Sequence, residues 1–341
     1  MTAQRLLTEE AVPAYACELG LAERGEPISV APGGDGNINW VRRVRIGGER
    51  PRSFVLKQAR PALERFPQYS APTERLLFEA RWLELAAPHD LDAICPRVLA
   101  LDAANRVLVL EDLSACERLD AALARGRAVA SEMEALARLL ARVHAATSND
   151  GALPAQFEND GMRRLHGEHI YVLPYQPNDF GLTPRLEAAA REVRADAALL
   201  RAASDCHAAY SRPSGALVHA DVQAGNLLLT ESGGAKLLDA EIAHVGDAAF
   251  DLGTLLAHLA LPAIARGEGA SASALLARVR GAYHAASACD DETLARAQRH
   301  AGCELIRRTI GAARVAAVAS DEAGLRVLSA GRAWALGRAS N

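Results

Sequence analysis

Residues 217–241 read LVHADVQAGNLLLTESGGAKLLDAE and carry the most decisive pattern in the chain. An apolar strand leads into His219, Asp221 and Asn226, and a second apolar strand ends in Asp239, eighteen residues after Asp221. Transfer of a phosphoryl group needs a carboxylate that orients the attacking hydroxyl, together with oxygen ligands that hold Mg²⁺. The stretch supplies both in the right order, so it predicts a phosphoryl-transfer site.

Length and composition limit the classes of protein that the chain can represent. A length of 341 residues suggests about two domains, and the apolar half of the sequence suffices for two ordinary cores. A net charge of -4 argues against a nucleic-acid partner or a membrane surface. The N-terminus has no apolar leader, no apolar run reaches the roughly 20 residues of a membrane span, and the six cysteines have no metal-site spacing. We therefore expect a cytoplasmic protein.

The first third of the chain has short strand-like segments. Runs of β-branched and aromatic residues, separated by Gly, Asn and Asp, predict strands at 28–31, 40–46, 53–57, 97–101 and 107–110. A helix is expected over 73–87, with Thr73 as its N-cap. These segments predict a small antiparallel sheet that carries one helix.

After Glu111 the sequence becomes rich in Ala, Leu, Arg and Glu with helical periodicity. The expected helices cover 130–147, 185–210, 248–261, 270–287, 291–317 and 323–338. Strand-like interruptions are expected near Tyr171 and at 217–219, 227–230 and 235–239. The whole pattern predicts an α+β, two-lobed, protein-kinase-like fold. Its lobes would be an ATP-binding lobe over 1–113 and a catalytic and substrate-binding lobe over 114–341.

A glycine-rich loop lies between the first two expected strands. Gly34 and Gly36 belong to the run GGDGNIN that ends at Asn39. Glycines allow backbone N–H groups to approach phosphates closely, which would suit a nucleotide. The same residues could also form a plain hairpin turn.

Lysine is scarce in this chain, because Lys57 and Lys236 are the only two and arginine supplies the remaining basic residues. Lys57 ends an apolar strand, the position from which a kinase lysine reaches the α and β phosphates of ATP. Glu79 on the following helix is the expected ion-pair partner. It is preferred over Glu74 and Glu84 because it lies mid-helix, on the arc expected to face inward.

Three further regions complete the predicted site. Glu111, Asp112 and Leu113 follow the last strand of the small lobe, where the backbone of a kinase contacts adenine. Asp221 is the expected base, and Asn226, Asp239 and Glu241 are the expected Mg²⁺ ligands. His219 is expected to brace the catalytic loop rather than take part in the chemistry, and Asp251 is expected to tie the loop down through its backbone amides.

The chain resembles the 5-methylthioribose kinases, within the aminoglycoside-phosphotransferase and choline-kinase-like group. The resemblance rests on residues 34–39 (GDGNIN), 56–59 (LKQA), 111–114 (EDLS) and 307–311 (RRTIG). It implies that Asn39, Lys57 and residues 111–113 contact ATP, and that Asp239 and Glu241 hold Mg²⁺. It also implies that Asp221 is the base, that Arg307 and Arg308 bind the sugar, and that the protein is a homodimer.

Four positions depart from the pattern of that family. Ala220, Gln223, Asn226 and Ala240 stand where the family has Gly, His, Ser and Pro. The predicted reaction is therefore phosphorylation of the 1-hydroxyl of 5-methylthioribose or a close relative such as 5-deoxyribose. The alternatives are a kinase for an aminoglycoside, choline or homoserine, and a catalytically silent nucleotide-binding protein that regulates a partner.

Overall fold

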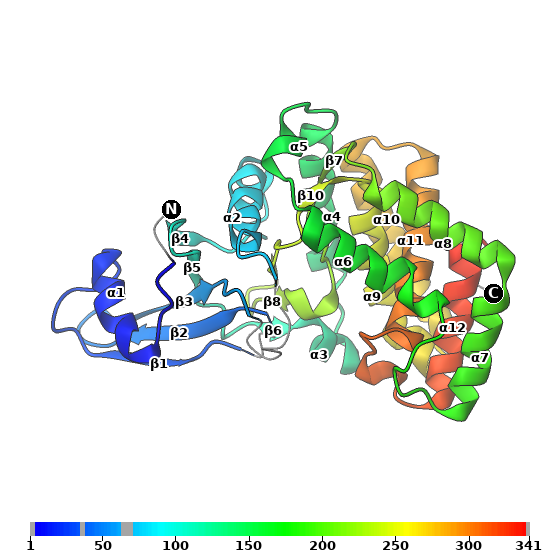
Figure 1. Cartoon of the computed structure of the whole chain (residues 1–341), viewed down its shortest axis with the longest axis horizontal. Coiled ribbons are helices and arrows are strands. Elements are labelled where there is room, and N and C mark those ends of the chain that lie inside the picture. Colours follow the sequence, from blue (N-terminus) through cyan, green and yellow to red (C-terminus); the bar gives the residue numbers. More distant parts are fainter. Residues whose placement is uncertain (1–3, 35–37, 63–70, 339–341) are drawn as a thin grey trace.

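The computed structural model describes residues 4–34, 38–62 and 71–338 of the chain. Two lobes lie side by side along the longest axis, a small one built on a sheet and a larger one built mainly of helices (Figure 1). This arrangement confirms the predicted α+β, two-lobed fold. The boundary placed between residues 113 and 114 stays a prediction.

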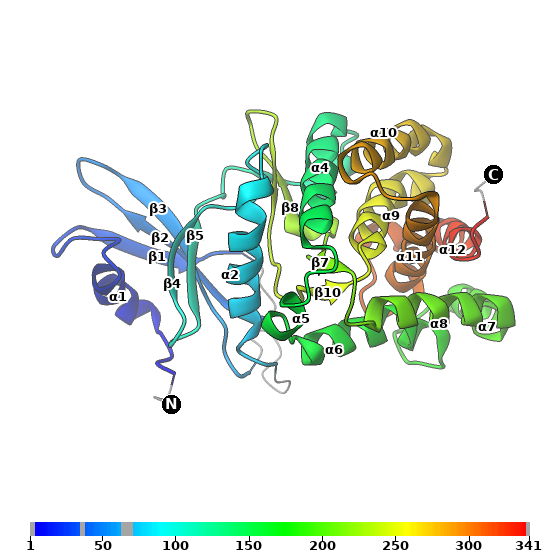
Figure 2. The same ribbon diagram turned by 90° about the horizontal axis from the view of Figure 1, so that it is seen from above.

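The small lobe is a five-stranded sheet in the order β1-β2-β3-β5-β4, and all neighbouring strands are antiparallel. The strands cover Ile28–Pro32 (β1), Trp40–Ile46 (β2), Arg52–Gln58 (β3), Val98–Asp102 (β4) and Val107–Glu111 (β5). Phe54 and Leu56 of β3 pack in one core with α1 (Val12–Glu18). The next residue, Lys57, faces the opposite side of the sheet because side chains alternate along a strand. That side carries α2 (Arg75–Ala86), which lies between the sheet and the larger lobe (Figure 2).

The larger lobe is built from helices that pack around α9. Its helices cover Leu119–Ala124 (α3), Ala130–Thr147 (α4), Leu153–Gln156 (α5), Asp160–Tyr171 (α6), Pro184–Ala195 (α7), Ala197–Ser211 (α8), Ala249–Arg266 (α9), Gly269–Ser287 (α10), Asp291–Ile310 (α11) and Asp321–Ala335 (α12). Short 3-10 turns cover Leu173–Tyr175, Ala224–Asn226 and Ala316–Val318 in this lobe. Two others, Glu9–Ala11 and Ala87–His89, belong to the small lobe. Helix α9 is buried along most of its length because α10, α11 and α12 surround it.

Two small antiparallel sheets hold the segments that carry Asp221 and Asp239 in the larger lobe. Strand β7 (Ala216–Val218) pairs with β10 (His244–Gly246), and β8 (Leu227–Leu229) lies between β6 (Glu117–Arg118) and β9 (Ala235–Leu237). The segment between β7 and β8 carries Asp221, and the segment between β9 and β10 carries Asp239. Because each segment is anchored by a strand at both ends, the two acidic residues have defined positions.

Two expectations about secondary structure were wrong, a strand near Tyr171 and a single helix over 185–210. Tyr171 ends α6 and lies in no strand, because its ring packs on Tyr210 and His300 and its hydroxyl lies 2.7 Å from His300 Nδ1. The helix expected over 185–210 is two helices, α7 and α8. Asp196 breaks it, since its extended backbone ends α7 and its carboxylate caps α8.

Two helix ends also differ from the expectation. Helix α2 begins at Arg75 with no side-chain cap, so Thr73 is not its N-cap. Helix α11 stops at Ile310 rather than near 317, because Gly311 takes up an extended backbone conformation. The helix-like composition extends past the start of α2 and the end of α11. Composition indicates where a helix lies better than it indicates the residues at which the helix begins and ends.

The two lysines of the chain both connect the lobes. Lys57 of β3 reaches Asp239 in the larger lobe, and Lys236 of β9 reaches Glu111 in the small lobe, each with an N–O distance below 3 Å. The amide of Leu237 also donates to the Ile94 carbonyl, at 3.0 Å.

In the described part of the chain, no helix is both long and apolar enough to cross a membrane.

Candidate active site

A cleft of about 570 Å³ lies between the two lobes. Its walls include ten of the predicted site residues: Gly34, Asn39, Lys57, Glu111, Asp112, Leu113, Asp221, Asn226, Asp239 and Glu241. Gly36 lies outside the described residues. Four motifs that are far apart in the sequence therefore meet around one space. Glu79, Arg307 and Arg308 are not among its lining residues and lie behind the wall.

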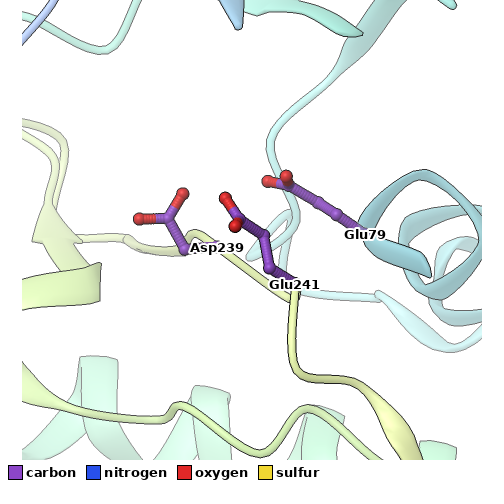
Figure 3. A group of neighbouring side chains, drawn as sticks. All are labelled: Glu79, Asp239 and Glu241. Carbon is purple, nitrogen blue, oxygen red and sulfur yellow. The ribbon is translucent and has the colours of Figure 1, made fainter. Parts of the chain in front are cut away.

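Lys57 lies at the centre of a carboxylate cluster. Its side chain is only 5% exposed, and Nζ lies 2.7 Å from Glu79 Oε2, 2.6 Å from Asp239 Oδ1 and 2.5 Å from Glu241 Oε1. Figure 3 shows Glu79 extending from α2 toward the segment that carries the other two carboxylates. Burial opposes the charge of the ammonium group, but the three carboxylates hold the pKa of Lys57 well above its ordinary value. The ion pair expected between Lys57 and Glu79 is present.

The same carboxylates provide ligands that suit a divalent cation. Oxygen atoms of Glu79, Asp239 and Glu241 lie within 4.8 Å of one another. The Asp239 side chain is 47% exposed, whereas Glu79 and Glu241 are buried. Hard oxygen ligands of this kind fit Mg²⁺, which usually binds one or two carboxylates and keeps several waters. The more exposed Asp239 is therefore the residue best placed to share a metal with a nucleotide.

Asp221 is held by two neighbouring amides. Its Oδ2 accepts hydrogen bonds from Asn226 Nδ2 at 2.6 Å and from Gln223 Nε2 at 3.1 Å. Burial raises the pKa of Asp221 to about 6, although Arg308, Arg307 and the Asn226 hydrogen bond act in the opposite direction. A carboxylate with that pKa is ionised at neutral pH and still basic enough to accept a proton. Because the Asn226 N–H₂ group points to Asp221, the amide oxygen of Asn226 remains for a metal.

The backbone before Asp221 is fixed by a buried anchor. Asp251 accepts the amide hydrogens of His219 at 2.7 Å and Ala220 at 2.8 Å, as expected from the sequence. His219 in turn accepts the amide hydrogen of Asp221 on Nδ1 at 3.2 Å, and its ring packs edge-on against Trp82 of α2. Burial lowers the pKa of His219 to about 4, so its imidazole is neutral. His219 therefore has the contacts of a brace.

Two residues of this region adopt left-handed backbone conformations. Ala220 and Asp239, one just before the predicted base and one in the predicted metal site, both have φ of 66°. Such φ values are unfavourable for residues other than glycine, and less so for Asp than for Ala. Strain of this kind persists where the surrounding structure imposes it. Here, Asp251 holds the amides of His219 and Ala220, and Lys57 holds the Asp239 side chain.

Arg75 is a site residue that the sequence analysis missed. It is fully buried in α2, one turn before Glu79. Its Nη2 donates to Asn39 Oδ1 at 2.8 Å, its Nε lies 3.4 Å from Glu241 Oε2, and Asn39 Nδ2 donates to the other Glu241 oxygen. Arg75 therefore joins the end of the glycine-rich loop to the carboxylate cluster. Its spacing from Glu79 was the available signal, but the many other arginines concealed it.

Arg307 and Arg308 form a second buried cluster, centred on Glu304. Glu304 Oε1 lies 2.6 Å from Arg308 Nε, and Glu304 Oε2 lies 3.1 Å from Arg307 Nη1. Burial opposes ionisation of Glu304, but the two arginines hold its pKa well below the usual value. Arg308 Nη2 also donates to Gln223 Oε1 at 2.8 Å. Since Gln223 also donates to Asp221, it connects the arginine pair to the predicted base.

Comparison with known proteins places this chain in a family. Residues 30–297 match the phosphotransferase enzyme family. The methylthioribose kinase of Bacillus pumilus is 26% identical over an alignment of 351 positions that covers 91% of this chain and 85% of that protein. The methylthioribose kinase of Bacillus cereus is 28% identical over 344 residues, with 91% and 86% covered. These relatives confirm the resemblance inferred from the motifs.

Solved structures with a similar fold have much lower sequence identity. Choline kinase from Cryptosporidium parvum superposes with a TM-score of 0.55 at 14% identity, covering 94% of both chains. Choline kinase LicA from Streptococcus pneumoniae gives a TM-score of 0.52 at 15% identity, covering 95% of this chain and 98% of that chain. These matches confirm the kinase-like fold. The chain therefore belongs to the phosphotransferase enzyme family, as a small-molecule kinase.

Proposed function

We propose that the protein uses ATP and Mg²⁺ to phosphorylate the 1-hydroxyl of 5-methylthioribose or of a closely related 5-substituted ribose. The observation that carries this proposal is the convergence of Lys57, Asp239 and Asn226 with the network Asp221–Gln223–Arg308 around one cleft. Lys57, Asp239 and Asn226 suit a nucleotide. The network of Asp221, Gln223 and Arg308 suits a small polyol. The similarity to methylthioribose kinases supports this choice of sugar.

The nucleotide is expected to bind on the side of the cleft formed by the small lobe. Residues 111–113 would contact adenine through their backbone, and Lys57 would move from Asp239 and Glu241 to the α and β phosphates while keeping Glu79. Asp239, Asn226 and Glu241 would hold Mg²⁺, which neutralises charge on the phosphates. Gly34 and Asn39 would lie over the phosphates, with Arg75 fixing Asn39.

Asp221 would then act on the acceptor. Its carboxylate would accept the hydrogen of the sugar 1-hydroxyl while a bond forms from that oxygen to the γ-phosphorus and the bond to the ADP oxygen breaks. Direct in-line transfer needs no covalent enzyme intermediate. Arg307 and Arg308 lie behind the wall of the cleft, so they would have to reach its surface when the substrate binds in order to contact the sugar hydroxyls and to stabilise the charge that develops on the transferred group.

An acceptor panel tests the proposal. ADP release would be measured with 5-methylthioribose, 5-deoxyribose, ribose, choline and an aminoglycoside, each with Mg²⁺ and ATP. We expect the highest kcat/KM with a 5-substituted ribose. The highest value with choline or an aminoglycoside would assign a different acceptor, and ATP binding without turnover on any acceptor would indicate a silent nucleotide-binding protein.

The remaining expectations about partners follow from the same proposal. A soluble sugar substrate requires neither a nucleic acid nor a membrane surface. We also propose a homodimer, from the resemblance to the 5-methylthioribose kinases. Sedimentation equilibrium would test it directly, and a monomer across the micromolar range would contradict it.

A further inference from the structure

A second cavity lies within the larger lobe. Its volume is about 1110 Å³, and it shares no lining residue with the cleft between the lobes in the part of the chain that the structure describes. The ends of α4, α10 and α12, the length of α8 and the first half of α11 form its walls. These helices lie in the lobe away from the sheet (Figure 2). A space of this size accommodates an organic molecule as well as ions.

The charges around this cavity favour an anion. Its lining includes Arg201, Arg212, Arg296 and Arg299 against Asp205 and Asp247, and Glu292 outside the lining pairs with Arg299 at 3.3 Å, which leaves a formal excess of one positive charge. Arg296 is engaged by Asp247, with distances of 3.0 and 3.2 Å between their atoms. Within the described residues, the side chains of Arg201 and Arg212 have no hydrogen bond or ion pair with the protein. These two guanidinium groups are therefore available to a ligand.

The inner wall of the cavity touches the support of the catalytic loop. His144 and Tyr283 are buried lining residues, and His144 Nδ1 lies 2.8 Å from the Tyr283 hydroxyl. His144 Nε2 lies 3.1 Å from Asp251 Oδ2, and that same oxygen accepts the amide hydrogen of His219. One imidazole therefore separates the cavity from the carboxylate that holds the backbone before Asp221.

We propose that this cavity is a second ligand site for a small phosphorylated metabolite, and that its occupation is coupled to the catalytic loop through His144 and Asp251. Guanidinium groups bind phosphate oxygens through pairs of charge-assisted hydrogen bonds, which is why phosphate is the favoured anion. The cavity is much larger than a phosphate group, so the ligand would carry an organic body. Coupling of this kind is reciprocal, so nucleotide in the cleft would also alter affinity at the cavity.

Binding can be measured separately from turnover. Glucose 6-phosphate and inorganic phosphate would each be titrated calorimetrically into the full chain, with the cleft saturated by a non-hydrolysable ATP analogue and Mg²⁺. We expect saturable binding, tighter for glucose 6-phosphate, and a loss of at least about tenfold in the double variant Arg201→Ala/Arg212→Ala. The variant Arg185→Ala/Arg280→Ala has the same net charge and alters arginines that do not line the cavity, so it should bind as the wild type does.

The outcomes separate the parts of the proposal. No saturable binding, or equal losses in both double variants, would overturn the site. Equal affinity for the two probes would keep the anion site and overturn contact with an organic body. Hydrogen exchange at the amides of His219 and Ala220 tests the coupling. We expect their exchange rates to change when the probe binds, and unchanged rates at saturation would overturn the link through Asp251.

Discussion

Replacement of Asp221 by Asn should make the protein more stable and much less active. Asp221 is partly buried, and its pKa is raised from 3.8 to about 6, so folding opposes its ionised form. That is about two pKa units at about 1.4 kcal/mol each, or about 3 kcal/mol of unfolding free energy lost at pH 7. Asparagine is neutral and keeps one acceptor oxygen for Asn226, so it should recover most of this loss. We allow about 1 kcal/mol for less favourable hydrogen bonding to Gln223 and expect a net gain of about 2 kcal/mol.

The pH dependence of that gain has a definite sign. Because the folded pKa lies above the unfolded one, the cost of ionised Asp221 is absent below pH 3.8 and accumulates as the pH rises to about 6. The wild-type cost at pH 4.5 is therefore only about 1 kcal/mol, and the advantage of the variant should almost disappear there. Urea unfolding of both proteins at pH 7 and pH 4.5 measures the difference, and an ADP-release assay measures turnover.

Turnover in the same variant should fall by at least about 100-fold, the usual contribution of a positioned base. Nucleotide affinity should be unchanged, because Asp221 contacts neither Lys57 nor Asp239 in the described hydrogen bonds and ion pairs. A variant that is less stable than the wild type at pH 7 would refute the assignment of a raised pKa. Near-normal turnover would remove Asp221 from the role of base.

Four further predictions follow from the same site. Below pH 6 the kcat/KM of the wild type should fall about tenfold per pH unit, as protonation removes the base, and a flat profile to pH 5 would contradict this. Lys57→Met should destabilise the protein by about 3–5 kcal/mol in urea unfolding, because it leaves buried carboxylates unpaired, and added Mg²⁺ should restore part of the loss. Ala220→Gly should stabilise it by about 1 kcal/mol by relieving a φ of 66°, whereas the same change at Ala243, where φ is not positive, should destabilise it. Gln223→Ala should raise KM for the sugar more than KM for ATP, since it separates Asp221 from Arg308, and equal effects on both would argue against that role.

The sequence predicted the parts of this protein that rest on local pattern. Strand β3 and the inward-facing Lys57 near its end follow from alternation, and the position of Glu79 follows from helical periodicity. The order and spacing of Asp221, Asn226 and Asp239 predicted phosphoryl transfer, because that chemistry depends on residue type and spacing. The larger α-helices were predictable because an apolar face repeats along each of them.

Features that depend on distant contacts were not predictable. Strand β10 is three residues long and exists through its pairing with β7, so it has no pattern of its own. Tyr171 looked like a strand residue, yet aromatic packing from other helices decided its conformation. Arg75 contacts Asn39 and Glu241 across the fold, and its spacing from Glu79 was too weak a signal in an arginine-rich chain to distinguish it from a surface arginine.

The placement of both lysines between the lobes has a practical consequence for chemical labelling. Amine-selective reagents have only Lys57, Lys236 and the N-terminal amine as targets in this chain. Lys236 is shielded by its ion pair with Glu111, and Lys57 by its ion pairs with Asp239 and Glu241 across the interface and with Glu79 in its own lobe, so the modification rates report how often these contacts break. Matched rates at the two lysines would indicate that the lobes separate as rigid bodies, and faster labelling of Lys57 alone would indicate a local opening at the cleft. Mass spectrometry of a two-site label would therefore measure the opening motion of the unmodified protein, without introduced probes.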